Sequence, residues 1–276
     1  MDRVFLRSQF AVYYRRARRV RLTIEAHTDY TALFPLKGRL LASVSDEEFE
    51  IEDEGALLIN PGSAVRAASR VETEFLMLTL APAFVLDLAV RLRLTLSGAN
   101  VSFRSGRIER DERLGRLAQD LMNELKEEEA GQEVVITAQV EQMLVHMLRH
   151  YANVRRSDEL ELSRVGLVDR RIRRAVEMMH AHMDKELPLE ELAGAAYLSP
   201  FHFARLFKKL TGASPHAYLA TLRVQRAQQL LAETDLSISE LSARVGYSSP
   251  SHFSKAFRQA TGLTPRAFRV SLVRGE

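Results

Sequence analysis

The chain has 276 residues, 46% of them hydrophobic and 27% charged, which is typical of a soluble globular protein with room for two domains. It contains no cysteine, which excludes disulfides, thiolate metal sites and a cysteine nucleophile. The first residues lack the apolar core of a signal peptide, and no apolar run approaches the roughly 20 residues that span a bilayer, so we expect a cytoplasmic protein without membrane contact.

The net charge of +3 is unevenly distributed along the chain. Residues 161–276 hold 17 Lys and Arg against 11 Asp and Glu, whereas residues 1–160 hold 22 against 25. Two stretches of the C-terminal part, 192–232 and 241–275, contain no acid at all. A basic run is often only a solvated face, but two acid-free basic stretches in one domain favour a polyanion as partner.

Residues 1 to about 105 have the pattern of short strands separated by Gly, Pro and acidic turns. The clearest apolar runs are 36–44, 48–51, 56–62 and 74–80. They predict a small antiparallel sandwich or barrel, although short apolar runs do not separate a strand from a buried helix cleanly.

A dense basic segment lies near the N-terminus. It consists of Arg15, Arg16, Arg18, Arg19 and Arg21. It is either a solvated strand edge or a contact for an anionic effector, for DNA or for the other domain.

From about 111 to 151 the apolar period becomes helical, with a break at Ala130-Gly131. One stripe consists of Leu114, Leu117, Leu121 and Leu125, and the other of Ile136, Val140, Met143, Met147 and Tyr151. Two such helices are expected to pack as an antiparallel pair. This pair either covers the sheet or forms a dimer seam, for which Ile136, Val140, Met143 and Met147 are the candidates.

We assign residues 1–154 to the first domain, the polar stretch 155–168 to a linker, and residues 169–276 to an all-helical second domain. In that domain a first apolar stripe at helical spacing is formed by Ile172, Ala175, Val176, Met179 and Met183. The fold class predicted for the whole chain is therefore two-domain α+β.

The second domain contains an internal repeat with a period of fifty residues. The segments Ser199–Pro215 and Ser249–Pro265 are identical at eight of seventeen positions. Each begins with an N-cap serine followed by proline, and Gly212 and Gly262 stand where a helix ends in a left-handed residue. A short helix and a tight turn precede each copy, at 189–198 and 238–248. Helix, turn and capped helix, twice over, is the layout of two helix-turn-helix units, whose second helix enters the DNA major groove.

Helical geometry separates an inner from an outer face in each capped helix. The inner faces are Phe203, Leu206, Phe207 and Leu210 in the first copy, and Phe253, Ala256, Phe257 and Ala260 in the second. The outer faces are Phe201, Arg205 and Lys208, and then Ser251, Lys255 and Arg258, which carry donors suited to base edges and phosphates.

Three aromatic residues near the helix starts have open roles. Phe201 points outward and either contacts a thymine methyl or sugar, or packs against the neighbouring turn. His202 and His252 lie on the flank, where phosphate contact or capping is expected rather than catalysis or metal binding.

Pro215–Glu233 is predicted as one helix that joins the two units. At 1.5 Å rise per residue it is about 27 Å long, comparable to one DNA turn of about 34 Å, so both reading helices can enter successive major grooves.

The segment 170–272 resembles the DNA-binding domain of the AraC/XylS family of transcription regulators. The resemblance includes the capped Ser-Pro helix with Arg205, the Gly246-Tyr247 turn, and the Thr261-Gly262 helix end. It implies base contacts by Phe201, Ala204 and Arg205 in the first unit, and by Ser251, His252 and Lys255 in the second. The complete set of DNA-contact candidates is Phe201, His202, Ala204, Arg205, Lys208, Lys209, Ser251, His252, Lys255 and Arg258.

The N-terminal region resembles the cupin-like sensing and dimerisation domains of the same family. The resemblance implies a homodimer that binds a small-molecule effector, with His27, Tyr30 and Arg39 as candidate contacts, and a possible contact with RNA polymerase. Cupin enzymes hold a metal with several His and a Glu, but His27 is the only histidine before residue 105, so we expect no metal, no cofactor and no enzyme. His146 and His150 are spaced i, i+4, which suits a metal, but surface or interface histidines are the expected interpretation. The alternatives are a constitutive dimeric regulator without a ligand and a cupin-type metalloenzyme.

Overall fold

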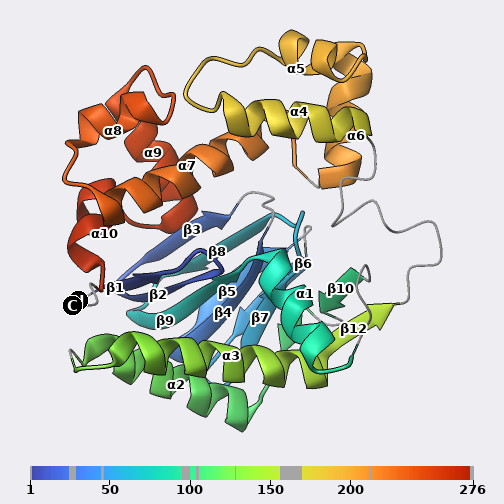
Figure 1. Cartoon of the computed structure of the whole chain (residues 1–276). Coiled ribbons are helices and arrows are strands. Elements are labelled where there is room, and N and C mark those ends of the chain that lie inside the picture. Colours follow the sequence, from blue (N-terminus) through green and yellow to red (C-terminus); the bar gives the residue numbers. More distant parts are fainter. Residues whose placement is uncertain are drawn as a thin grey trace.

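The computed structural model describes residues 2–24, 29–44, 47–94, 100–103, 106–127, 129–155, 170–211 and 213–273. An N-terminal β domain with helices α1 to α3 is followed by a C-terminal domain built from helices α4 to α10 (Figure 1). This is the two-domain α+β class that the sequence predicts. Most of the expected linker, 156–168, lies outside the described residues.

The β domain is an antiparallel sandwich. A six-stranded sheet in the order β1-β2-β9-β4-β7-β11 packs against a four-stranded sheet in the order β3-β8-β5-β6, and β10 pairs with β12 in a separate ribbon. The strands are β1 (Arg3–Leu6), β2 (Phe10–Ala17), β3 (Val20–Ile24), β4 (Tyr30–Lys37), β5 (Leu40–Val44), β6 (Glu47–Ile51), β7 (Ala56–Ile59), β8 (Val65–Ser69), β9 (Thr73–Leu80), β10 (Asn100–Phe103), β11 (Arg107–Ile108) and β12 (Ala152–Arg155).

Strand β2 illustrates how the sequence fills both faces of the larger sheet. Side chains alternate between the faces of a strand, so Phe10, Val12 and Tyr14 point toward the helix pair. Ala11 and Tyr13 point the other way, into the core between the two sheets. Because both faces are covered, all five side chains are buried.

Two features of this region differ from the expected succession of strands. The run 36–44 is not one strand, because Gly38 adopts a left-handed φ of 81° and turns the chain from β4 into β5. The stretch after β9 forms a helix, α1 (Pro82–Arg91), with proline in its first turn and Phe84 and Leu88 buried on one side.

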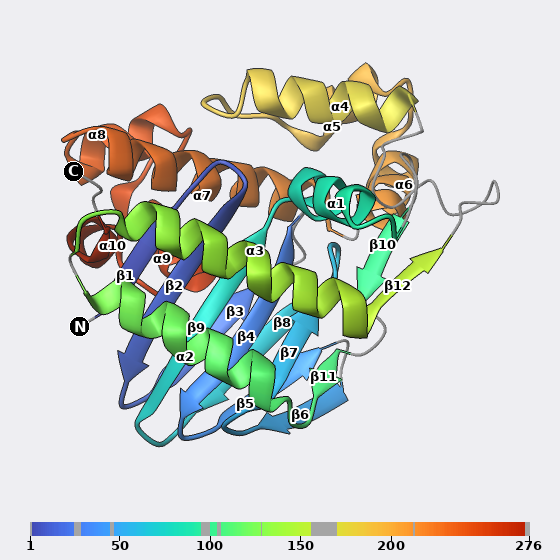
Figure 2. The same ribbon diagram turned by 60° about the horizontal axis from the view of Figure 1, so that its bottom comes forward.

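Helices α2 (Glu112–Lys126) and α3 (Gln132–Tyr151) form the predicted pair and lie across the outer face of the larger sheet (Figure 2). The predicted seam residues Ile136, Val140, Met143 and Met147 are completely buried within this chain, in one core with the sheet. The prediction that these four side chains form a dimer seam is therefore wrong, because they have no surface left for a partner. Their stripe covers the sheet instead.

The C-terminal domain consists of two helix-turn-helix units connected by α7. Its helices are α4 (Arg170–Ala181), α5 (Leu189–Ala195), α6 (Pro200–Thr211), α7 (Pro215–Glu233), α8 (Ile238–Arg244), α9 (Pro250–Thr261) and α10 (Pro265–Ser271). The bounds of α7 are the predicted ones. Its first half packs into the core of the first unit through Tyr218 and Leu222, and its second half into the core of the second unit through Leu230 and Leu231.

The second unit also packs on the β domain. Phe257 and Phe268 belong to the same core cluster as Tyr13 and Leu22 of the sandwich. The chain end adds a backbone contact, because the N–H of Val273 donates to the carbonyl of Val4 at 2.7 Å. The first unit has a core of its own, so it is joined to the rest through α7.

The arginines of the basic segment 15–21 have different surroundings in the structure. Arg16 pairs with Glu72 at 2.8 Å, which is a solvated strand-edge arrangement. Arg15 turns toward Gly262 at the end of α9, so of the open alternatives a contact with the other domain holds for this residue. Arg18, Arg19 and Arg21 are exposed.

None of the helices in the described part of the chain is long and apolar enough to cross a membrane.

Candidate nucleic-acid interface and interdomain cavity

The capped helices α6 and α9 present the same pattern of buried and exposed positions. Phe203 and Phe207 of α6 are fully buried, and so are Phe253 and Phe257 at the equivalent positions of α9. The outward residues of both helices are accessible: Phe201, His202, Arg205, Lys208, Lys209, Ser251, His252, Lys255 and Arg258 are exposed, and Ala204 is half-buried. The two predicted faces are therefore present in each helix.

The start of α6 brings an aromatic pair to the surface. Phe201 is 73% exposed, so its ring does not pack into the neighbouring turn, and it lies beside the ring of His202 with 6.0 Å between the centroids. His202 Nδ1 is 3.0 Å from Oγ of Ser199, the residue before the helix. His202 thus takes part in the helix start, while most of the Phe201 side chain stays exposed to solvent.

The helix ends follow the predicted sequence signals with one difference. Ser214 and Thr264 cap α7 and α10 through their side-chain oxygens, which accept from the N–H of Ala217 and Ala267. Ser249 occupies the cap position of α9, but its side chain makes no capping hydrogen bond. Gly262 ends α9 in the left-handed region at a φ of 75°, as predicted, whereas Gly212 lies outside the described residues.

A capping box before α8 was not predicted from the sequence. Oγ of Ser237 accepts from the N–H of Glu240, and the Glu240 carboxylate accepts from the N–H of Ser237. The signal was present in the sequence as Ser-x-x-Glu ahead of an apolar residue. It fixes where the first helix of the second unit begins.

Two of the three predicted effector residues, Tyr30 and Arg39, do not share a site in the described structure. Tyr30 is buried in the core between sheet and helices, where its hydroxyl donates to the carbonyl of Val101. Arg39 lies at a hairpin on the surface and pairs with Glu50 at 2.7 Å. His27 lies outside the described residues. The assignment of Tyr30 and Arg39 to an effector site is therefore corrected, because a fully packed phenol and a surface ion pair have no cavity in common.

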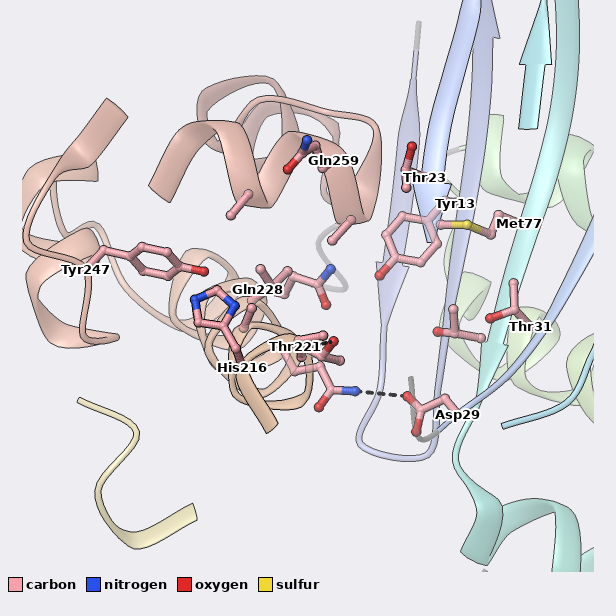
Figure 3. A pocket seen from close by; sticks show the side chains of 17 residues that line it. Tyr13, Thr23, Asp29, Thr31, Met77, His216, Thr221, Gln228, Tyr247 and Gln259 are labelled. Carbon is pink, nitrogen blue, oxygen red and sulfur yellow. Dashed lines mark hydrogen bonds between the residues drawn. The ribbon is translucent and has the colours of Figure 1, made fainter. Parts of the chain in front are cut away.

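A cavity of about 270 Å³ lies instead between the two domains. The sandwich contributes Tyr13, Thr23, Asp29, Thr31, Met77 and Thr79, and the helical domain contributes residues of α7 and α9 together with Tyr247 (Figure 3). No local sequence signal marks these residues, because they come from four strands and two helices that meet only in the folded chain.

The polar groups of this cavity are hydrogen-bond donors and acceptors with one acid among them. The amide of Gln225 donates to the Asp29 carboxylate at 3.1 Å, which ties α7 to the start of β4. Burial raises the pKa of Tyr13, opposed by a hydrogen bond with Gln228, so the phenol stays protonated. His216 and Gln259 add further polar atoms, and none of the described residues that line the cavity is a Lys or Arg.

The histidine pair on α3 has a partner that spacing alone does not reveal. Nε2 of His146 lies 2.7 Å from the Asp111 carboxylate, which also accepts from the hydroxyl of Tyr151 at 2.6 Å. Within the described ranges, no group of three or more His, Cys, Asp or Glu side chains is arranged to hold a metal ion.

Two family models match the chain. An AraC-binding-like domain matches residues 1–149, and a helix-turn-helix domain matches residues 192–271. Among curated proteins, the probable transcriptional regulator LumQ of Photobacterium leiognathi is 26% identical over 75% of this chain and 78% of its own length. The regulatory protein PocR of Salmonella typhimurium is 38% identical over 28% of this chain, and the lactose operon transcription activator of Staphylococcus xylosus is 35% identical over 30%. The matched segments are 26% and 29% of those two relatives, so the chain spans only about a quarter to a third of their length.

Solved structures of ToxT from Vibrio cholerae share the fold over nearly the whole chain. One has a TM-score of 0.62 at 11% identity, over 96% of this chain and 98% of ToxT. Another, with an unsaturated fatty acid bound, has a TM-score of 0.62 at 12% identity over 98% of both chains. With a family model that matches more than half of its residues and a second that matches its paired helix-turn-helix units, this chain belongs to the AraC-type family of DNA-binding transcription regulators.

Proposed function

We propose that α6 and α9 are the two base-reading helices of this regulator, each entering one major groove of its operator. The observation that carries this is the matched pair of exposed faces, built from positions fifty residues apart on one scaffold. On α6 the face carries Arg205 and Lys208, and on α9 it carries Lys255 and Arg258. Guanidinium and ammonium groups suit guanine acceptors and phosphates.

The two faces differ in chemistry although their scaffolds agree. Phe201 on α6 is apolar and suits a thymine methyl, while the equivalent Ser251 on α9 is a small hydroxyl. Two unlike faces on one chain read two unlike half-sequences. The proposed operator is therefore asymmetric within the footprint of one chain.

Truncation of one reading side chain on each helix tests this assignment. With the full chain on a selected duplex site, Arg205→Ala and Lys255→Ala should each weaken specific binding by about 1–3 kcal/mol, measured by fluorescence anisotropy. Arg266→Ala is the matched control, because Arg266 is an exposed arginine on α10, outside the reading faces. Equal, small losses for all three variants would contradict the assignment.

We further propose that the interdomain cavity binds a small effector. Its position supports this, since a ligand there would touch strands of the sandwich and both α7 and α9. Its volume of about 270 Å³ is near the lower end of the range of about 300–1,000 Å³ for small-molecule sites, which favours a small ligand.

The chemistry of the cavity favours an uncharged or cationic effector. ToxT has been solved with an unsaturated fatty acid and with a naphthalenyl butenoic acid, both of which carry a carboxylate. In this chain the lining offers the Asp29 carboxylate, amides, hydroxyls and an imidazole, without Lys or Arg among the described lining residues. The half-buried carboxylate of Asp29 disfavours a second negative charge beside it.

A matched ligand series tests this choice. An amine, an alcohol and a carboxylate on one aromatic skeleton are compared by thermal shift, where a ligand at 100 times its Kd adds about 2.7 kcal/mol of stability. We expect the amine or the alcohol to stabilise the chain and Asp29→Asn to weaken the amine selectively. Stabilisation by the carboxylate alone would contradict the proposal. If neither this series nor a thermal-shift screen of metabolites stabilises the chain, the result favours the constitutive regulator without a ligand.

Homodimerisation, contact with RNA polymerase and location in the cytoplasm stay predictions of the sequence. A dimer would have to use a surface other than the buried stripe of α3, and sedimentation equilibrium of the full chain measures whether it forms.

A further inference from the structure

A groove lined with arginines lies where the β domain meets the end of α9. Its cationic members are Arg15 of β2, Arg19 of the following turn, Arg21 of β3, Arg70 after β8 and Arg258 of α9. None of the described residues that line it is an Asp or Glu. We call these five residues the arginine groove.

The positive charge of the arginine groove is poorly compensated. The Arg15 side chain is only 13% exposed, its nearest carboxylate is Asp2 at 3.8 Å, and among the described residues its Nε has no hydrogen-bond partner. Burial lowers the pKa of Arg15, and the charge of Arg258 lowers it further against the opposing effect of Asp2. Gathering cations in this way is unfavourable unless an anion joins them.

Several arginines elsewhere on the β domain are paired with acids. Arg39 is held by Glu50 at 2.7 Å, and Arg110 by Glu54 at 2.6 Å. In the arginine groove, by contrast, Arg19, Arg21 and Arg70 are exposed, and no acid is found among the described residues that line the groove. The contrast points to a polyanion from outside the chain.

Arg258 makes the groove continuous with the reading face of the second unit. It lies four and seven residues after Ser254 and Ser251, on the exposed side of α9 that also carries Lys255. A duplex that seats α9 in its major groove brings phosphates past both ends of that helix, and a guanidinium binds a phosphate through two parallel hydrogen bonds. Several exposed arginines along one groove suit the successive phosphates of a nucleic-acid backbone, whereas a site for a small free anion would enclose that anion.

We propose that Arg19, Arg21 and Arg70 of the N-terminal domain contact the DNA phosphate backbone beside the half-site that α9 reads. The β domain is then part of the DNA-binding surface. This inference rests on the proposed role of α9 as a reading helix.

The salt dependence of DNA binding tests this without knowledge of the operator. The full chain binds a labelled random-sequence duplex, and the observed association constant is followed over a series of KCl concentrations. The triple variant Arg19→Gln, Arg21→Gln, Arg70→Gln should bind more weakly. Its log–log slope should be smaller by about 0.9 for each phosphate that the protein no longer neutralises, or about 2.7 for three phosphates. Circular dichroism checks that the variant is folded.

The matched control is the triple variant Arg110→Gln, Arg113→Gln, Arg116→Gln. It removes the same charge from exposed residues at the start of α2, on the face of the β domain away from α9 (Figure 1). Its slope should equal that of the unaltered chain. Equal slopes for both triple variants would overturn the proposal, because the effect would then be one of net charge alone.

Two further arms separate the possible failures. If the groove variant loses binding of inorganic tripolyphosphate but keeps the DNA slope, the groove serves a small anion and the proposal is wrong. If Lys255→Ala and the groove variant both leave DNA binding unchanged, the reading role of α9 fails as well. If Lys255→Ala weakens binding and the groove variant does not, only the present inference fails.

Discussion

At the residue scale, Asp111 shows how one side chain connects the helix pair. It caps α2 by accepting from the N–H of Leu114 at 2.9 Å, and it also accepts from Tyr151 and meets His146 of α3. Burial alone would raise the pKa of Asp111, but the hydrogen bonds from Tyr151, His146 and the Leu114 N–H lower it to about 2. The ionised carboxylate is therefore a stabilising part of the fold.

This predicts an acid-sensitive contribution to stability. Because the folded pKa lies below the unfolded value of about 3.9, the stabilisation is present above about pH 4 and is lost as the pH falls toward 2. Asp111→Asn keeps a good capping residue but removes the charge, so it should cost about 1–2 kcal/mol at neutral pH and flatten the acid limb. Urea unfolding across pH measures this, with exposed Asp120→Asn as control; an unchanged acid limb in Asp111→Asn would refute it.

At the residue scale, sequence predicts well which side chains of a helix are exposed, but it does not predict which distant residues share a site. The outward residues of α6 and α9 were assigned from helical periodicity, which depends only on local sequence. Tyr30 and Arg39 were assigned to an effector site by resemblance, and packing placed one in a core and the other in a surface ion pair. The partner of His146 is Asp111, 35 residues away, which spacing on one helix does not reveal.

At the element scale, helix ends were predicted well because their signals are local. Ser214-Pro215 and the bounds of α7 agree with the structure. Helix α1 was missed within a region of strands, since its single apolar side resembles a short buried strand, and the turn at Gly38 was absorbed into one apolar run. The dimer seam failed for a similar reason, because a periodic apolar stripe does not say what covers it.

The second unit offers a matched pair of caps for a stability prediction. Ser237 makes a complete capping box with Glu240 before α8, whereas Ser249 before α9 makes no side-chain cap. Ser237→Ala should therefore cost about 1 kcal/mol, and Ser249→Ala clearly less. Urea unfolding of the two variants compares them directly, and an equal or larger loss for Ser249→Ala would show that the capping geometry does not decide the energy.

At the scale of the whole molecule, the second unit and the β domain are built as one body. They share a core cluster, and Gly262 at the end of α9 receives the guanidinium of Arg15 from β2. A Cβ at position 262 would collide with that guanidinium and would also be strained by the φ of 75°. Sequence could predict the left-handed glycine, but not the arginine that arrives from the other domain.

The contact between Arg15 and Gly262 predicts that the effects of substitutions at these two positions on stability are coupled. Gly262→Ala should lower the free energy of unfolding by about 1–2 kcal/mol from the backbone alone, and by a smaller further amount from displacing the Arg15 guanidinium, which is the far end of a flexible side chain. In an Arg15→Ala background the cost should shrink to the backbone part. Gly194→Ala, in a helix with open space around it, should instead be stabilising by up to about 1 kcal/mol. Equal costs of Gly262→Ala in both backgrounds would mean that Arg15 does not touch this site in solution.

The central claim is that one chain reads two unlike half-sequences with α6 and α9. Selection of binding sites from randomised duplexes by the full chain tests it most directly. We predict two different sequence blocks about 10 base pairs apart, with Arg205→Ala relaxing the preference within one block and Lys255→Ala within the other. A single block, two identical blocks, or relaxation of the same block by both variants would contradict the claim.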